Sequence, residues 1–160
     1  EIALSPVGSE MCIRDRYAYL FQCHVLDTLV HATKDISPPP GFAAFQERSI
    51  DSNALFTKLQ HQLGHMDDIE YATYMQQYIR QRAHPKCRVT GRIFLDIDPT
   101  IAMERVQSRA RDGESTVTLQ YQEKLNDLHQ EWKQNEMNNG RPILVINTVE
   151  NDVRLSLIHI

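Results

Sequence analysis

Cysteine is scarce in this chain, and its cysteines show no spacing that would give them a shared role. Cys12, Cys23 and Cys87 are odd in number, lie far apart and form no CxxC pair. Disulfide-stapled domains carry a dense, even set of cysteines, and structural zinc sites need closely spaced ligand pairs. The sequence therefore predicts neither a disulfide framework nor a zinc site, and a reducing compartment is expected.

Long apolar runs and an excess of positive charge are also missing. The longest aliphatic runs, such as Ile143 to Ile146, fall far short of the ~20 residues that span a bilayer, and no charged-then-apolar leader opens the chain. A formal net charge of -4 does not suit a surface that neutralises the phosphates of DNA or RNA. We expect a soluble, cytoplasmic protein with no nucleic-acid partner and no membrane partner.

Hydrophobic residues are plentiful enough for the core of one domain, since they make up 41% of the 160 residues. Clear periodicity begins only at Tyr17, and the segments SPVGSEMCIRDR and LSLIHI resemble translated adapter or vector sequence. We therefore expect residues 17–154 to hold the domain and residues 1–16 and 155–160 to be artefactual. A natural flexible N-terminus is the alternative for the first segment.

Helical periodicity dominates the first half of the chain. One helix is predicted from Tyr17 to about Lys34, and SPPPG at 37–41 ends it. A second follows a cap at Asp51 or Ser52 and ends at Gly64, and a third begins at the acidic pair 67–68. The apolar residues that set these periods are Phe21, Val25, Leu26, Leu29 and Val30, then Leu55, Leu59 and Leu63, then Ile69, Ala72, Met75 and Ile79.

Short apolar runs predict buried strands at 42–45, 93–97 and 143–147. After the second run, Asp98 and Pro99 supply an N-cap and a first helical residue. A long amphipathic helix follows, with Tyr121, Leu125, Leu128 and Trp132 on one face. Strands that alternate with helices imply an α/β fold in which helices flank a parallel sheet.

Arginines gather where the helix after Asp98 runs into a glycine-containing loop. Arg105 and Arg109 are four residues apart and share a helical face, and Arg111 follows them. Converging guanidinium groups suit phosphate oxygens, which arginine binds in bidentate fashion. The alternative is that these side chains stay solvated and only offset the helix dipole.

Four short sequence segments occur in the same order as in one known protein family. FQ at 21–22, ERS at 47–49, FLDIDPTIAMERVQSRARDGES at 94–115 and LQYQEKLNDLHQEW at 119–132 resemble the deoxynucleoside kinase family in order and spacing. The resemblance covers residues 17 to about 150. It implies a P-loop kinase-like parallel sheet that lacks its first strands. It also implies transfer of the γ-phosphoryl group of ATP, with Mg²⁺, to the 5'-hydroxyl of a deoxynucleoside in nucleotide salvage.

The resemblance assigns the substrate side of the site to the first half of the chain. Gln22 would hold the base through its amide, and Asn53 is a candidate second base contact whose alternative role is a helix N-cap. Val25 and Phe56 would form an apolar wall, unless they are ordinary core. Glu47 would help to place Mg²⁺, and Arg48 would lie near the 5'-hydroxyl. Otherwise Glu47 and Arg48 form an exposed ion pair.

The phosphate side is assigned to the second half by the same resemblance. Arg105, Arg109 and Arg111 match lid arginines that close over the phosphates of ATP. Glu114 matches a lid carboxylate that binds the sugar 3'-hydroxyl. Asp152 lies in a segment that loosely resembles the family's adenine-binding loop.

Departures from the family pattern limit what this chain is expected to do alone. No glycine-rich GxxGxGKS-type loop occurs, no glutamate in residues 1–16 fits the context of the general base, and one lid acid is replaced by Gly113. We therefore expect the chain alone to be inactive. The rival interpretations are a nucleoside monophosphate kinase and a non-catalytic helical interaction module. Base preference is left open, and a homodimer is one option for the assembly.

Overall fold

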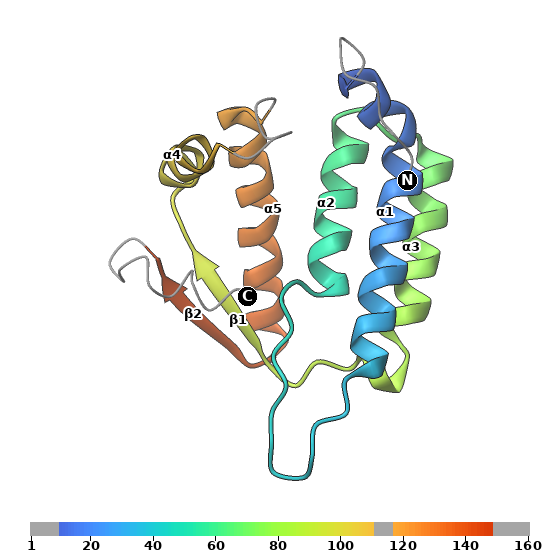
Figure 1. The fold of residues 1–160 in the computed structure, drawn as a ribbon, viewed down its shortest axis with the longest axis vertical. Coiled ribbons are helices and arrows are strands. Elements are labelled where there is room, and N and C mark those ends of the chain that lie inside the picture. The colour runs from blue at the N-terminus through green and yellow to red at the C-terminus, as the bar shows by residue number, and fades with distance from the viewer. Residues whose placement is uncertain (1–9, 111–116, 149–160) are drawn as a thin grey trace. The chain divides into compact units, whose positions relative to one another are not determined.

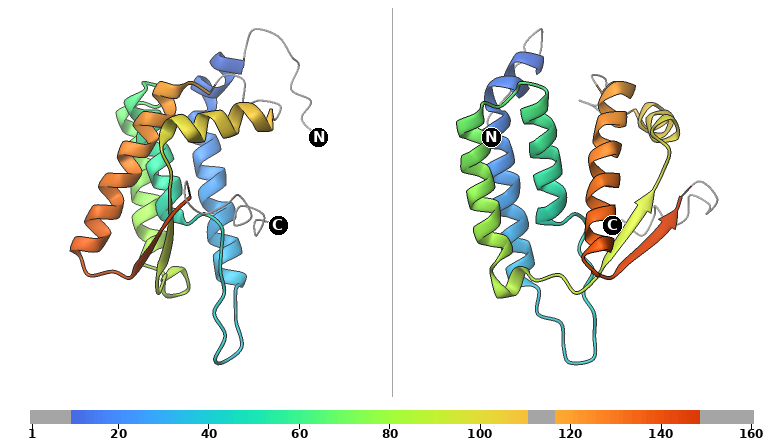
Figure 2. Two further views of the ribbon diagram at one scale, coloured as in Figure 1. Left: turned by 90° about the vertical axis from the view of Figure 1, so that its left-hand side faces the viewer. Right: turned by 180° about the vertical axis from the view of Figure 1, so that it is seen from behind.

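A computed structural model of the chain describes residues 10–110 and 117–148, which fall into two compact units divided between Arg88 and Val89. The first unit contains α1 (Glu10–Asp35), α2 (Ile50–Gln62), α3 (Asp68–Arg82) and the short 3-10 helix η1 (Pro85–Cys87). The second contains β1 (Arg92–Asp96), α4 (Pro99–Arg109), α5 (Leu119–Asn138) and β2 (Ile143–Asn147). Figures 1 and 2 show these elements, and each unit is described by itself.

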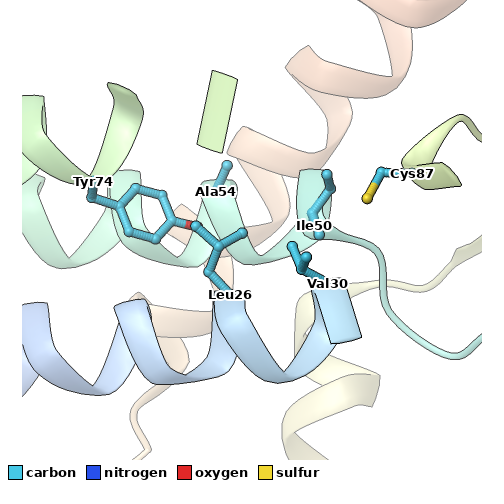
Figure 3. Packing of buried hydrophobic residues seen from close by; sticks show 6 residues of the cluster. All are labelled: Leu26, Val30, Ile50, Ala54, Tyr74 and Cys87. Carbon is cyan, nitrogen blue, oxygen red and sulfur yellow. The ribbon is translucent and has the colours of Figure 1, made fainter. Parts of the chain in front are cut away.

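The first unit is a three-helix arrangement in which each long helix packs against the other two. Its core, drawn in Figure 3, combines residues of all three helices with one from η1. The buried side chains are Leu26, Val30, Ile50, Ala54, Tyr74 and Cys87. On α1 the buried positions recur every four residues, because residues that far apart lie on one face of a helix. Burial of this apolar surface stabilises the unit by roughly 25 cal/mol per Å².

The sequence predicted these helices but not all of their ends. The α1 helix begins at Glu10 rather than at Tyr17, since an existing helix can extend without an apolar pattern to guide it. Ser49, not Asp51 or Ser52, caps α2: its hydroxyl accepts a hydrogen bond from the Ser52 amide at 3.2 Å. Asp67 caps α3 in a reciprocal capping box, as the acidic pair predicted. Gly64 follows the end of α2 with a φ of +78°, a conformation that favours glycine.

Two predicted apolar faces are also different in the structure. Phe21 on α1 is exposed, as are Ile69 and Ile79 on α3. The buried positions are instead Gln22 on α1 and Tyr74 on α3. Gln22 and Tyr74 therefore lie in the core, although the apolar pattern had predicted that neighbouring residues would be buried there. Both side chains can form hydrogen bonds, which makes their burial possible.

The second unit is built on two parallel strands, paired from Arg92 with Ile143 to Asp96 with Asn147. The α5 helix packs beside them, and the Phe94 ring of β1 lies with its centroid 6.5 Å from that of Trp132. Glu136 of α5 is buried and forms ion pairs with Arg92 at 3.0 Å and with a second arginine just before β2. The predicted α/β arrangement, with parallel strands and flanking helices, is confirmed.

One predicted strand is absent. Residues 42–45 form no strand, and Phe42 and Phe45 have exposed fractions of 73% and 82%. A strand needs a neighbour to pair its backbone. Within the described ranges β1 and β2 pair with each other, so residues 42–45 have no partner there. None of the helices in the described part of the chain is long and apolar enough to span a bilayer.

Candidate functional site

A buried polar cluster joins the three helices of the first unit. Gln22 of α1 and Asn53 of α2 have exposed fractions of 6% and 4%, and Tyr74 of α3 is fully buried. The Asn53 amide nitrogen donates to the Gln22 backbone oxygen at 3.2 Å and to the Tyr74 hydroxyl at 2.7 Å. The structure thus brings Gln22 and Asn53 together. It adds Tyr74, which the sequence did not single out.

The Gln22 side chain differs from its neighbours because its amide oxygen is buried and has no hydrogen-bond partner among the described residues. Leaving a buried polar atom unpaired costs about 1–3 kcal/mol, and native structures keep few such atoms. A lone glutamine in an amphipathic helix is more often solvated. Gln22 is instead a buried acceptor that a ligand N–H group can satisfy.

The Tyr74 hydroxyl stays protonated over the whole neutral range. Burial raises the pKa of Tyr74 to about 12, against the opposing effect of hydrogen bonds with Thr57 and Asn53. Thr57 is itself fully buried, and its hydroxyl donates to the Asn53 backbone oxygen at 2.9 Å. Asn53, Thr57 and Tyr74 therefore form one connected hydrogen-bond network.

A second buried group lies at the start of α2. Asp51, with an exposed fraction of 3%, accepts a hydrogen bond from the Tyr78 hydroxyl at 2.6 Å and pairs with Arg82 at 3.0 Å. Burial, followed by the charge of Asp51, raises the pKa of Tyr78 well above its usual value. From the sequence alone, Asp51 is only one of two candidate helix caps. This network instead fixes the first turn of α2, which directly follows the ERS segment, to α3.

The ERS segment itself is exposed at the entrance to α2. Glu47 and Arg48 are both exposed, and the Arg48 backbone has a φ of +57°, a region that residues other than glycine seldom adopt. The Arg48 guanidinium lies 5.2 Å from the centroid of the half-buried Phe56 ring, within the range of a cation–π interaction. Val25 of α1 is also half-buried.

Metal ligands do not gather anywhere in the described ranges, 10–110 and 117–148. No group of three or more His, Cys, Asp or Glu side chains lies together there. Glu47 is a single exposed carboxylate. It can supply one oxygen to an ion whose other ligands come from water or from a ligand's phosphates.

The predicted arginines of the second unit lie on α4. Arg105 and Arg109 are exposed, and the Arg105 guanidinium donates to the Thr148 backbone oxygen at 3.0 Å, which ties α4 to the end of β2. Their predicted partners Arg111, Glu114 and Asp152 lie outside the described residues. Each unit is described by itself, so the arginines of α4 and the polar cluster of the first unit are two separate candidate sites.

A hollow also lies at the carboxyl end of the parallel strands. It is lined by the last residues of β1 and β2, by the residues that follow β1, and by Asn126 and Gln130 of α5. Asp96, one of its lining residues, accepts a hydrogen bond from Gln130 at 2.8 Å and pairs with Lys133 at 3.2 Å. Ligands of parallel α/β sheets commonly bind at this end of the strands. The sequence did not single out Asp96, because its partners are more than thirty residues away.

Comparison with known proteins agrees with the four sequence blocks. A family model described as deoxynucleoside kinase matches residues 13–157. The chain is 31% identical over 135 residues to a probable deoxycytidine kinase of fowlpox virus, covering 82% of this chain and 57% of that protein. It is 36% identical over 89 residues to a mitochondrial deoxyguanosine kinase of Xenopus laevis, covering 54% of this chain and 34% of that one. The chain therefore spans about half the length, or less, of these curated relatives.

Solved structures share the fold. A deoxyadenosine kinase from M. mycoides, solved with bound dCTP, superposes with a TM-score of 0.70 at 21% identity. The match covers 99% of this chain and 82% of that one.

Proposed function

Because the chain belongs to the deoxynucleoside kinase family, we propose that the protein it comes from transfers the γ-phosphoryl group of ATP to the 5'-hydroxyl of a deoxynucleoside. The observation that carries this proposal beyond family membership is the buried, unpaired oxygen of Gln22. A nucleobase edge offers N–H donors and ring-nitrogen acceptors in one plane. The amide of Gln22 can pair with such an edge, and the adjacent Asn53 supplies a second contact.

The neighbours of these amides suit a flat ring that carries a sugar. Phe56 and Val25 are half-buried apolar side chains on the two helices that hold Asn53 and Gln22. In the proposal they form the wall beside the base. Arg48, held over the Phe56 ring, then lies between the base and the reacting end of the nucleoside. Its charge stabilises the phosphoryl oxygens as transfer proceeds.

The phosphate donor is handled by other groups in this proposal. Magnesium bound with ATP neutralises phosphate charge, and the exposed carboxylate of Glu47 suits a hard cation whose remaining ligands are phosphate and water oxygens. Arg105, Arg109 and Arg111 stabilise the transferred group from the lid. Glu114 binds the 3'-hydroxyl, and Asp152 belongs to the adenine loop. Phosphoryl transfer depends mainly on positioning and charge, which these side chains supply.

The extent of the functional domain is part of the same proposal. Residues 17–154 form an incomplete kinase domain, residues 1–16 and 155–160 are foreign to it, and the chain alone is inactive. A phosphate-binding loop and a general base have to come from sequence that this chain does not contain. A cytoplasmic location and a homodimer also stay predictions.

The direct test uses the product of the complete open reading frame that encodes this chain, called the complete protein below. It is incubated with ATP, Mg²⁺ and each of the four deoxynucleosides, and separately with their 5'-monophosphates. Formation of deoxynucleoside monophosphates supports the proposal. Activity restricted to the monophosphates favours a nucleoside monophosphate kinase, and no binding of either substrate favours a helical interaction module.

A further inference from the structure

The residue that follows β2 is fastened to the last residue of β1 by two hydrogen bonds to one atom. Asp96 and Asn147 form the last pair of the parallel strands, and Thr148 comes directly after them. The Thr148 amide donates to the Asp96 backbone oxygen at 2.9 Å, and the Thr148 hydroxyl donates to the same oxygen at 3.0 Å. A carbonyl oxygen has two lone pairs and can accept both. Thr148 is therefore held by its backbone and by its side chain.

Asp96 is itself held by α5. Its two carboxylate oxygens accept separately, one from the Gln130 amide at 2.8 Å and the other from the Lys133 ammonium group at 3.2 Å. The Asp96 side chain is half-buried, and charge interactions of partly buried groups are screened less by salt than those of exposed groups. The atom that anchors Thr148 thus belongs to a residue fixed to both β1 and α5.

Arg105 of α4 uses this anchored residue as its hydrogen-bond acceptor. Its guanidinium nitrogen Nη2 donates to the Thr148 backbone oxygen at 3.0 Å, although the Arg105 side chain is exposed. A guanidinium group is planar and carries five N–H donors in a fixed fork. Because one nitrogen is bound to a fixed carbonyl oxygen, the directions open to the remaining donors are restricted. The contact lies just beyond the carboxyl ends of the strands, where ligands of parallel sheets commonly bind.

We propose that Thr148 is a positioning residue for phosphoryl transfer, which holds Arg105 so that its remaining N–H donors meet the phosphate oxygens of ATP. This inference rests on the proposed function, in which Arg105 acts on those phosphates. An arginine on an exposed helix face otherwise samples many rotamers, and it loses that freedom when it binds a phosphate. Thr148 restricts Arg105 before ATP arrives, so less freedom is lost on binding.

The test measures dissociation constants of the complete protein by isothermal titration calorimetry, for ATP and for the deoxynucleoside that it phosphorylates best. Thr148→Val keeps the shape of the side chain and removes its hydroxyl, so ATP binding should weaken about three- to tenfold while the deoxynucleoside affinity stays the same. Thr148→Ser keeps the hydroxyl and should retain the wild-type affinity for ATP. Thr73→Val is the matched control on α3, because the Thr73 hydroxyl also donates to a backbone oxygen, and it should change neither constant.

A double-mutant cycle separates the positioning of Arg105 from a direct effect on the chain around Thr148. Arg105→Ala should weaken ATP binding at least as much as Thr148→Val, and adding Thr148→Val to Arg105→Ala should have no further effect. Should Thr148→Val fail to fold, Thr148→Ala removes the same hydroxyl and takes its place.

Three results overturn this inference and leave the kinase proposal standing: an unchanged ATP affinity in Thr148→Val, an equal loss in Thr148→Ser, or additive effects in the cycle. Absence of any deoxynucleoside phosphorylation by the wild-type protein overturns the kinase proposal itself.

Discussion

The Arg82 side-chain nitrogen Nε lies 3.0 Å from the buried carboxylate of Asp51, and this pair ties the last turn of α3 to the first turn of α2. Asp51 sits three positions after Arg48, so the pair anchors the helix end that follows the ERS segment. A carboxylate this buried is stable only while its partners remain.

Removal of Arg82 should therefore destabilise the first unit. Arg82→Ala leaves the Asp51 charge buried with the Tyr78 hydroxyl still bound, so we expect a loss of about 2 kcal/mol in the free energy of unfolding. Urea denaturation of the complete protein measures it. Arg80→Ala, on the exposed surface of the same helix, is the control and should change that free energy by no more than about 0.5 kcal/mol. Equal effects of the two substitutions would contradict the anchoring role.

Gln22 offers a test that separates function from stability. Gln22→Met keeps the length of the side chain and removes a buried oxygen that has no partner, so the free energy of unfolding should stay the same or rise. The contact with the base is lost, and kcat/KM for deoxynucleosides should fall about tenfold or more. Gln76→Ala, an exposed glutamine on α3, should leave kcat/KM unchanged. A Gln22→Met protein that is unstable and fully active would contradict the assignment of Gln22 to the base.

Arg48 should be required for activity and dispensable for folding. Its positive φ favours glycine, so Arg48→Gly relieves backbone strain of about 1 kcal/mol while removing the cation–π contact with Phe56. The free energy of unfolding should change little. Loss of a positive charge beside the transferred group should reduce kcat about 10²- to 10³-fold. Steady-state kinetics and thermal unfolding of this variant check both expectations, and near-normal kcat would exclude Arg48 from the reaction.

Alkaline pH should destabilise the first unit through Tyr74. Its pKa is about 12 in the folded protein and 10.0 when unperturbed, so between these values the unfolded chain releases a proton that the folded chain keeps. The free energy of unfolding then falls as pH rises from 10 to about 12. Below pH 10 the stability that protonated Tyr74 contributes is fully present. The Tyr74→Phe protein should lose less of its own stability over that interval. Chemical denaturation at a series of pH values measures the difference, and parallel curves would contradict it.

The sequence predicted those parts of the fold that depend on local rules. The cap at Asp67, the stop at Gly64 and the Asp98–Pro99 helix start follow from the chemistry of a few neighbouring residues. The strand predicted at 42–45 was wrong, because an apolar run becomes a strand only where another strand can pair with it.

The candidate site was only partly predictable for a related reason. Resemblance to the family singled out Gln22 and Asn53, and the structure places them in contact. Tyr74 and Asp51 were missed, because their partners lie 21 to 31 residues away in the chain and no local pattern marks such a pairing. Buried polar networks are specified by tertiary packing, which periodicity does not encode.

The most direct measurement is transfer of labelled γ-phosphate from ATP to deoxycytidine, deoxyadenosine and thymidine by the complete protein, run in parallel for wild type and Gln22→Met. We expect the wild-type protein to form labelled deoxynucleoside 5'-monophosphate, and Gln22→Met to fold normally but to lose about tenfold or more of kcat/KM. If the wild-type protein transfers no phosphate to any deoxynucleoside, or if Gln22→Met retains wild-type kcat/KM, the account of this site as a deoxynucleoside site is wrong.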